Sequence, residues 1–113
     1  MRLYHYPGCA TCKKAAKHLA GRDLDLVHLV EATPSVAVLA DLWTRSGLPL
    51  RKLFNTSGQS YRAGGFGARI AEMSEAEMLA ALAADGMLIK RPILDTGGEV
   101  LVGYDPARYE RLP

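Results

Sequence analysis

The sequence predicts an α/β fold made of a βαβ half and a ββα half, with a helical insertion between the two halves. Three features of the 113-residue chain support this expectation. The first thirty or so residues read as strand, helix and strand, and the last twenty-five or so read as a β-hairpin followed by a short helix. The stretch between them carries mainly helical patterns.

The N-terminal half contains the predicted βαβ unit. Residues 2–6 are rich in aromatic side chains and favour a short strand. Residues 13–20 favour a helix that ends at Gly21, and residues 24–30 alternate in the manner of a second strand. Because βαβ crossovers are right-handed and join parallel strands, we expect these two strands to be parallel neighbours.

Residues 33–86 form the predicted insertion. Thr33 and Pro34 are a suitable N-cap and first-turn proline for a helix that stops near Gly47. Further along, the segment Ser74-Glu75-Ala76-Glu77 matches a capping box, and the alanine- and leucine-rich helix behind it should continue to about residue 85.

The C-terminal half contains the predicted hairpin. Residues 88–94 and 99–103 read as two strands around a turn at residues 95–98, and Asp105-Pro106 should cap a last short helix. This order of elements is thioredoxin-like topology enlarged by a helical insertion. We expect a single domain over residues 1–113.

Composition excludes several functional classes. The chain is 49% hydrophobic, enough for a workable core, and its formal net charge is only +2. That balance gives no general field for binding nucleic acid directly. No apolar run is long enough to span a membrane, and the N-terminus lacks a signal-peptide pattern, so we expect a soluble, cytoplasmic protein.

The two cysteines, Cys9 and Cys12, are the most informative residues. They lie where the first strand turns into the first helix, which places Cys9 at a helix N-terminus. Unpaired backbone N–H groups and the helix dipole stabilise a thiolate at such a position. Cys12 is one turn further along, so it could reach the first sulfur and close a disulfide. This arrangement is typical of a redox-active thiol pair.

Two other interpretations of the pair are open. The cysteines could simply be buried in the core, or they could bind zinc. Tetrahedral zinc would need two further ligands, and only His5, His18 and His28 are available without a second CxxC motif. We therefore expect no metal site.

Positive residues flank the thiol pair. Lys13 could lower the thiol pKa or attract an anionic partner such as glutathione, or it could belong to a solvated helix face. Arg91 precedes Pro92 at the entrance to the third strand. In thioredoxin-like folds a proline at this place is usually cis and packs against the reactive cysteines. Arg91 would then carry a positive charge near Cys9, unless it is an ordinary surface arginine.

Four segments together resemble the ArsC/Spx/YffB family of thioredoxin-fold proteins, over nearly the whole chain. They are Leu3-Tyr4 with Cys9-Ala10-Thr11-Cys12-Lys13-Lys14-Ala15, Leu53-Phe54-Asn55-Thr56, Ile89-Lys90-Arg91-Pro92-Ile93-Leu94 and Val102-Gly103-Tyr104. The resemblance implies a thioredoxin-like fold and a site built around Cys9, Cys12 and Arg91. Pro92, Lys13 and Asn55 are the expected substrate-binding residues.

The branches of this family imply different functions. Arsenate reductases use one cysteine and three arginines, of which Cys9 and Arg91 match, whereas Asn55 and Gly103 replace the other two arginines. This replacement disfavours arsenate as the substrate. The YffB branch, suggested to comprise glutathione-dependent thiol reductases, matches well around residues 55–62.

We therefore expect a glutaredoxin-like thiol–disulfide oxidoreductase. Cys9 would attack a protein or small-molecule disulfide, and Cys12 would resolve the mixed disulfide. Glutathione or a thioredoxin or glutaredoxin system would regenerate the dithiol, with no bound cofactor. The alternative is an Spx-type redox sensor that binds the C-terminal domain of the RNA polymerase α-subunit.

Overall fold

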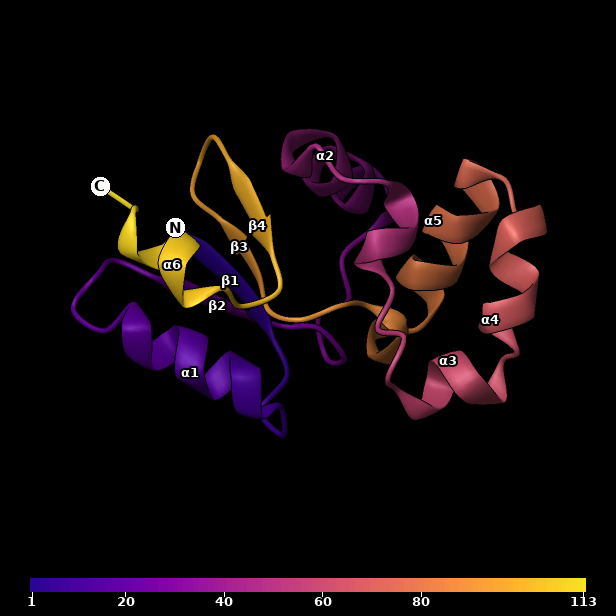
Figure 1. Ribbon diagram of the computed structural model, residues 1–113, viewed down its shortest axis with the longest axis horizontal. Coiled ribbons are helices and arrows are strands. Elements are labelled where there is room, and N and C mark those ends of the chain that lie inside the picture. The colour runs from indigo at the N-terminus through magenta and orange to yellow at the C-terminus, as the bar shows by residue number, and fades with distance from the viewer.

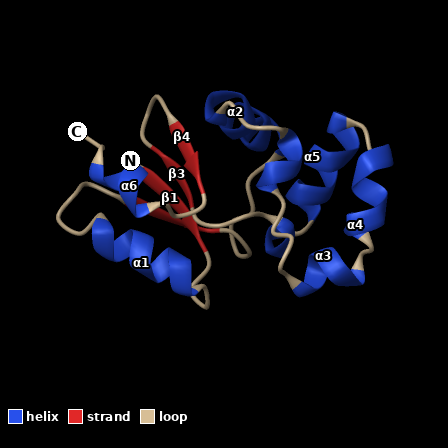
Figure 2. Ribbon diagram, viewed as in Figure 1, coloured by secondary structure: helices blue, strands red, loops and turns tan.

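A four-stranded mixed sheet, built from both ends of the chain, forms one part of the computed structural model, which describes residues 1–113 (Figure 1, Figure 2). Its strands are β1 (Arg2–His5), β2 (Asp25–His28), β3 (Ile93–Asp95) and β4 (Val100–Val102), in the order β2-β1-β3-β4. β1 and β2 are parallel, and the other two pairs are antiparallel. The chain has the predicted α/β, thioredoxin-like fold.

Six α-helices and three 3₁₀ turns complete the structure. They are α1 (Ala10–His18), α2 (Val36–Ser46), η1 (Leu50–Leu53), α3 (Gln59–Ala63), α4 (Phe66–Arg69), η2 (Ile70–Glu72), α5 (Glu75–Ala84), η3 (Gly86–Leu88) and α6 (Pro106–Glu110). The elements from α2 to η3 form the helical insertion, which lies beside the sheet in Figure 1.

Alternating side chains cover the two faces of the sheet with separate apolar layers. Leu3, Leu94 and Leu101 point to one face and join a buried cluster with Leu19, the C-cap of α1, and Tyr109 of α6. The intervening residues point to the other face and pack against the insertion; they are Tyr4, Ile93 and Val100. A single buried cluster of 14 residues therefore continues from the sheet into the helices of the insertion.

The start of α2 corrects the predicted cap. Its N-cap is Ser35, whose hydroxyl accepts a hydrogen bond from the Val38 N–H at 3.2 Å, so the assignment of Thr33 as N-cap was wrong. The Thr33 hydroxyl instead donates to the Leu29 carbonyl at 2.6 Å. The hydroxyl of Thr33 thus holds the loop against the end of β2. The helix begins two residues later, after Ser35.

The third strand is shorter than the predicted run over residues 88–94, because β3 begins only at Ile93. The preceding residues pair with the insertion. Ile89 forms an antiparallel bridge with Phe54, and the Lys90 N–H donates to the Leu53 carbonyl at 2.7 Å. The apolar pattern was correct, but only tertiary structure decides which partner each residue pairs with.

The capping box at Ser74 and the C-terminal hairpin and helix are confirmed. Ser74 and Glu77 exchange hydrogen bonds at the start of α5, and Asp105 caps α6. None of the helices has the length and apolar character needed to cross a membrane.

Candidate thiol active site

Cys9 is the N-cap of α1, at the turn that follows β1. Its backbone is extended (φ −93°, ψ 118°), and its sulfur accepts a hydrogen bond from the Cys12 N–H at 3.2 Å. The Cys9 N–H in turn donates to the Tyr6 carbonyl at 3.0 Å, which closes the turn around Pro7 and Gly8. A sulfur thus occupies the place that a serine or aspartate oxygen usually takes at a helix start.

The surroundings of Cys9 favour its charged form. Partial burial by itself would raise the pKa of Cys9, but hydrogen bonds from Cys12 and Thr11 outweigh it, so that the pKa lies below its usual range. The Thr11 hydroxyl oxygen is 3.1 Å from the Cys9 sulfur. The positive charge of Arg91 contributes in the same direction.

Cys12 has the opposite properties. Its side chain is buried, with 2% exposure, whereas Cys9 is partly exposed. Burial, followed by the hydrogen bond of its thiol to Cys9, raises the pKa of Cys12 to about 12. Near neutral pH, Cys12 is therefore a protonated hydrogen-bond donor, and Cys9 is the more exposed and more acidic of the two thiols.

Arg91 and Pro92 lie on the segment that leads from the insertion into β3. The Arg91–Pro92 peptide bond is cis, as expected, and Pro92 is buried. The Arg91 guanidinium donates to the carbonyls of Met87 at 3.0 Å and Ile89 at 3.3 Å. Its central carbon also lies 5.3 Å from the centre of the Tyr6 ring, so Arg91 is a fixed cation beside the thiol turn.

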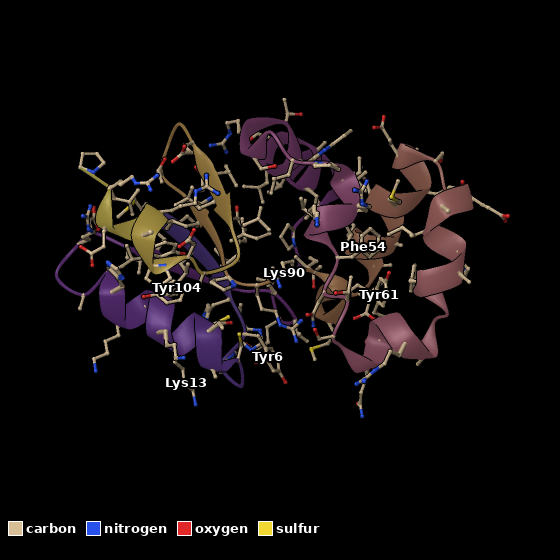
Figure 3. All side chains as sticks on the ribbon, in the orientation of Figure 1. Tyr6, Lys13, Phe54, Tyr61, Lys90 and Tyr104 are labelled. Carbon is tan, nitrogen blue, oxygen red and sulfur yellow. The ribbon has the colours of Figure 1, made fainter.

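Lys13 and Asn55 belong to different parts of the fold, the first to α1 and the second to the helical insertion. Lys13 is exposed on α1, and its backbone N–H donates to the Cys9 carbonyl at 3.2 Å. Its side chain extends from the outer side of the helix (Figure 3). Asn55 is half-buried and donates its backbone N–H to the Leu88 carbonyl at 2.7 Å, so it adjoins the Arg91 segment. No hydrogen bond joins the Asn55 side chain to either cysteine.

Sequence reasoning missed two residues of the site, Thr11 and Tyr6. Thr11 could have been found as a hydroxyl between the two cysteines. The Tyr6 ring packs under Gly8, where an added Cβ would lie only 3.0 Å from the ring. It also meets the His28 ring edge-on, with centroids 5.7 Å apart. Tyr6 thereby connects the thiol turn to both β2 and Arg91.

The fold and the site define a thioredoxin-fold protein with a thiol at a helix N-terminus and a cis-proline just before β3. Within this class, the chain belongs to the ArsC family, whose sequence model matches residues 4–112. It is 44% identical to the uncharacterized protein YusI of Bacillus subtilis (strain 168), an alignment that covers 97% of this chain and 95% of YusI.

Solved structures agree with this assignment. A protein from Bacteroides fragilis described as related to the ArsC family superposes with a TM-score of 0.93, at 38% identity, over 97% of this chain and 94% of that one. The arsenate reductase from Vibrio cholerae gives a TM-score of 0.85 at 26% identity, over 97% and 96% of the two chains.

A regulator is also similar to this chain. The regulatory protein MgsR of Bacillus subtilis (strain 168) is 25% identical over 99% of this chain and 89% of MgsR. The proteins similar to this chain therefore include one described as an arsenate reductase and one described as a regulatory protein.

Proposed function

We propose that this protein is a glutaredoxin-like thiol–disulfide oxidoreductase that works through Cys9 and Cys12. The observation that carries the proposal is the position of the Cys9 sulfur as hydrogen-bond acceptor at the start of α1. The Thr11 hydroxyl and the cation of Arg91 add to this stabilisation of a thiolate. Partial exposure of Cys9 gives a substrate access to it.

The reaction has two exchange steps. The Cys9 thiolate attacks one sulfur of a substrate disulfide, which forms a mixed disulfide and releases the other substrate sulfur as a thiolate that takes up a proton. Cys12 then loses its proton to solvent and attacks the Cys9 sulfur, which releases the second substrate thiol. The substrate has gained two electrons, and the protein is left with a Cys9–Cys12 disulfide. Two glutathione molecules, or a thioredoxin or glutaredoxin, reduce it.

The remaining site residues have supporting roles in this proposal. Arg91 lowers the pKa of Cys9, and Pro92 with Asn55 and Lys13 borders the approach of the substrate. Arsenate reduction is disfavoured because the site holds a single arginine. At Gly103, φ is +80°, a conformation in which an arginine would be strained.

The test is glutathione-coupled reduction of a small disulfide by the reduced protein. Cys9→Ser should abolish turnover, because no other exposed sulfur can attack. Cys12→Ser should keep the first step and accumulate a mixed disulfide on Cys9, which mass spectrometry detects. Equal turnover in wild type and Cys9→Ser would contradict the proposal. Lys52→Gln, at an exposed position of η1, serves as a control for handling and folding.

The second candidate is a redox-sensing regulator, and the similarity to MgsR favours it. In this case the Cys9–Cys12 pair would switch the affinity of the protein for the C-terminal domain of the RNA polymerase α-subunit. The experiment is a binding titration with that purified domain, using protein in the oxidised and the reduced state. Absence of binding in both states would rule out this candidate.

A further inference from the structure

The Tyr6 side chain lies at a point where three parts of the fold meet. Tyr6 directly follows β1 and begins the turn that leads to Cys9. Its ring lies against Gly8 of this turn, His28 at the end of β2, and Arg91 on the segment before β3. In Figure 3, Tyr6 lies between α1 and the helical insertion. Only the folded chain brings these groups together.

The Tyr6 ring carries the Arg91 guanidinium. The central carbon of the guanidinium is 5.3 Å from the ring centre, within the range of a cation–π contact. The same group donates to the carbonyls of Met87 at 3.0 Å and Ile89 at 3.3 Å. No ion pair or hydrogen bond joins it to another side chain, so the ring is its one side-chain partner.

The ring itself is held by neighbouring elements. An added Cβ at Gly8 would lie 3.0 Å from Cε2 of Tyr6, so the thiol turn lies directly on the ring. The His28 ring meets Tyr6 edge-on, with centroids 5.7 Å apart. His28 is fixed in turn, because its Nδ1 accepts hydrogen bonds from the Val30 N–H at 3.2 Å and the Glu31 N–H at 3.1 Å. The guanidinium therefore packs on a ring that has little freedom to move.

The position of this guanidinium affects the reacting sulfur. Burial disfavours the Cys9 thiolate, but hydrogen bonds from Cys12 and Thr11, together with the positive charge of Arg91, place the pKa of Cys9 below its usual range. The effect of a charge depends on its distance and on how much water screens it. A guanidinium that turned away into solvent would stabilise the thiolate less.

We propose that Tyr6 is a positioning residue of the thiol reaction, because its ring holds the Arg91 guanidinium where the charge stabilises the Cys9 thiolate. Tyr6 does not react itself, and its hydroxyl is not required. The inference rests on the proposed function where it concerns disulfide turnover. The reactivity of Cys9 is a separate quantity that is measured without any disulfide substrate.

The first experiment follows the alkylation of Cys9 by neutral iodoacetamide as a function of pH, with mass spectrometry as the readout. Tyr6→Leu removes the ring, so the midpoint of the profile should move to higher pH. Below the midpoint this variant should react about two- to fourfold more slowly than wild type, and at high pH, where both are ionised, equally fast. Tyr6→Phe keeps the ring and should reproduce the wild-type profile.

Tyr104→Leu is the matched control. Tyr104 is also half-buried and meets the Tyr109 ring edge-on at 4.9 Å, but it forms no cation–π contact. Its loss should leave the Cys9 midpoint unchanged. Tyr6→Met is a second variant without a ring and should give the same result as Tyr6→Leu. An unchanged midpoint in the ring-free variants, a loss of their rate at high pH, or an equal shift in Tyr6→Phe would overturn the proposal.

The second experiment is a double-mutant cycle with Arg91→Gln. If the ring acts through the guanidinium, Tyr6→Leu should change the alkylation rate by less than about 1.5-fold once Arg91 is absent. An undiminished effect in the Arg91→Gln background would show that the ring acts on the turn itself, and it would overturn the proposal. Failure of wild type to reduce any disulfide, with the alkylation results as expected, would instead contradict the proposed oxidoreductase function alone.

Discussion

The Thr11 side chain lowers the pKa of Cys9 through a single hydroxyl group. It lies between the two cysteines, and its oxygen is 3.1 Å from the Cys9 sulfur. A hydrogen bond is stronger when its acceptor is charged than when its acceptor is neutral. The Thr11 hydroxyl therefore stabilises the Cys9 thiolate more than the Cys9 thiol. The Cys12 N–H provides a second such bond, which a side-chain substitution leaves in place.

We predict that Thr11→Val raises the pKa of Cys9, because the β-branched shape is kept and only the hydroxyl that stabilises the thiolate is lost. The measurement is the pH dependence of the iodoacetamide reaction of Cys9. Thr11→Ser, which keeps the hydroxyl, should stay close to the wild-type profile. An identical midpoint for Val and wild type would show that the hydroxyl does not bind the thiolate.

Asp95 and Arg45 join two elements that are far apart in the sequence. Arg45, in the last turn of α2, donates to both carboxylate oxygens of Asp95 in β3, at 2.7 and 2.8 Å. The Asp95 side chain is only 18% exposed. The guanidinium of Arg45 lowers the pKa of Asp95 below its usual range, against the effect of burial. The pair therefore fastens the insertion to the sheet.

We predict that Asp95→Asn lowers the free energy of unfolding by about 1–2 kcal/mol at pH 7. Because the folded-state pKa of Asp95 is depressed, its contribution is present above the unfolded pKa of about 3.9 and is lost as pH falls through the folded pKa. Urea unfolding should therefore give nearly equal stabilities for wild type and variant at about pH 2.5.

Asp41→Asn is the control for this comparison, since Asp41 binds the same Arg45 but is 60% exposed. Its effect should be smaller than that of Asp95→Asn. A deficit for Asp95→Asn that is as large at low pH as at pH 7 would show that the charge is not responsible.

Gly86 allows η3 to lie directly against the end of β2. An added Cβ at this position would overlap the Leu29 carbonyl, which belongs to the backbone and cannot move aside easily. We predict that Gly86→Ala lowers the free energy of unfolding by about 1–3 kcal/mol in thermal or urea unfolding. Gly98→Ala, where an added Cβ meets nothing within 4 Å, should have almost no effect. Equal stabilities for the two variants would contradict this contact.

The sheet and the insertion share one of the two hydrophobic cores of the molecule. Tyr4 and Ile93 from the sheet belong to the same buried cluster as Leu39 of α2 and Leu82 of α5. The other cluster covers only the face beneath α1 and α6. Because the larger cluster crosses between the two parts, neither part can unfold without exposing apolar surface of the other.

We therefore predict that the whole chain unfolds in one transition. Leu82→Ala, at a fully buried position of the insertion, should cost about 2–5 kcal/mol. Fluorescence of Trp43 in α2 reports on the insertion, and amide hydrogen exchange of β1 and β3 reports on the sheet. The free energies of unfolding obtained from the two measurements should fall by the same amount. Wild-type protection of the sheet amides in this variant would show that the two parts unfold separately.

Local signals in the sequence were enough to predict most elements of this protein. The cysteine spacing and the capping box at Ser74 act over a few residues, so the chain specifies them without reference to the rest of the fold. The βαβ order also predicted that β1 and β2 are parallel, because the handedness of the crossover is nearly invariant. The position of Cys9 at the start of α1 was predictable because the motif lies directly between a strand pattern and a helix pattern.

Only the tertiary structure decided the contacts between distant segments. It made β3 begin only at Ile93, because the residues before it pair with Phe54 and Leu53 of the insertion. It also brought the Arg91 guanidinium within hydrogen-bond distance of two backbone carbonyls. The Lys90 side chain, by contrast, forms no ion pair. Such outcomes depend on which groups meet across the chain, and a pattern of neighbouring residues does not contain that information.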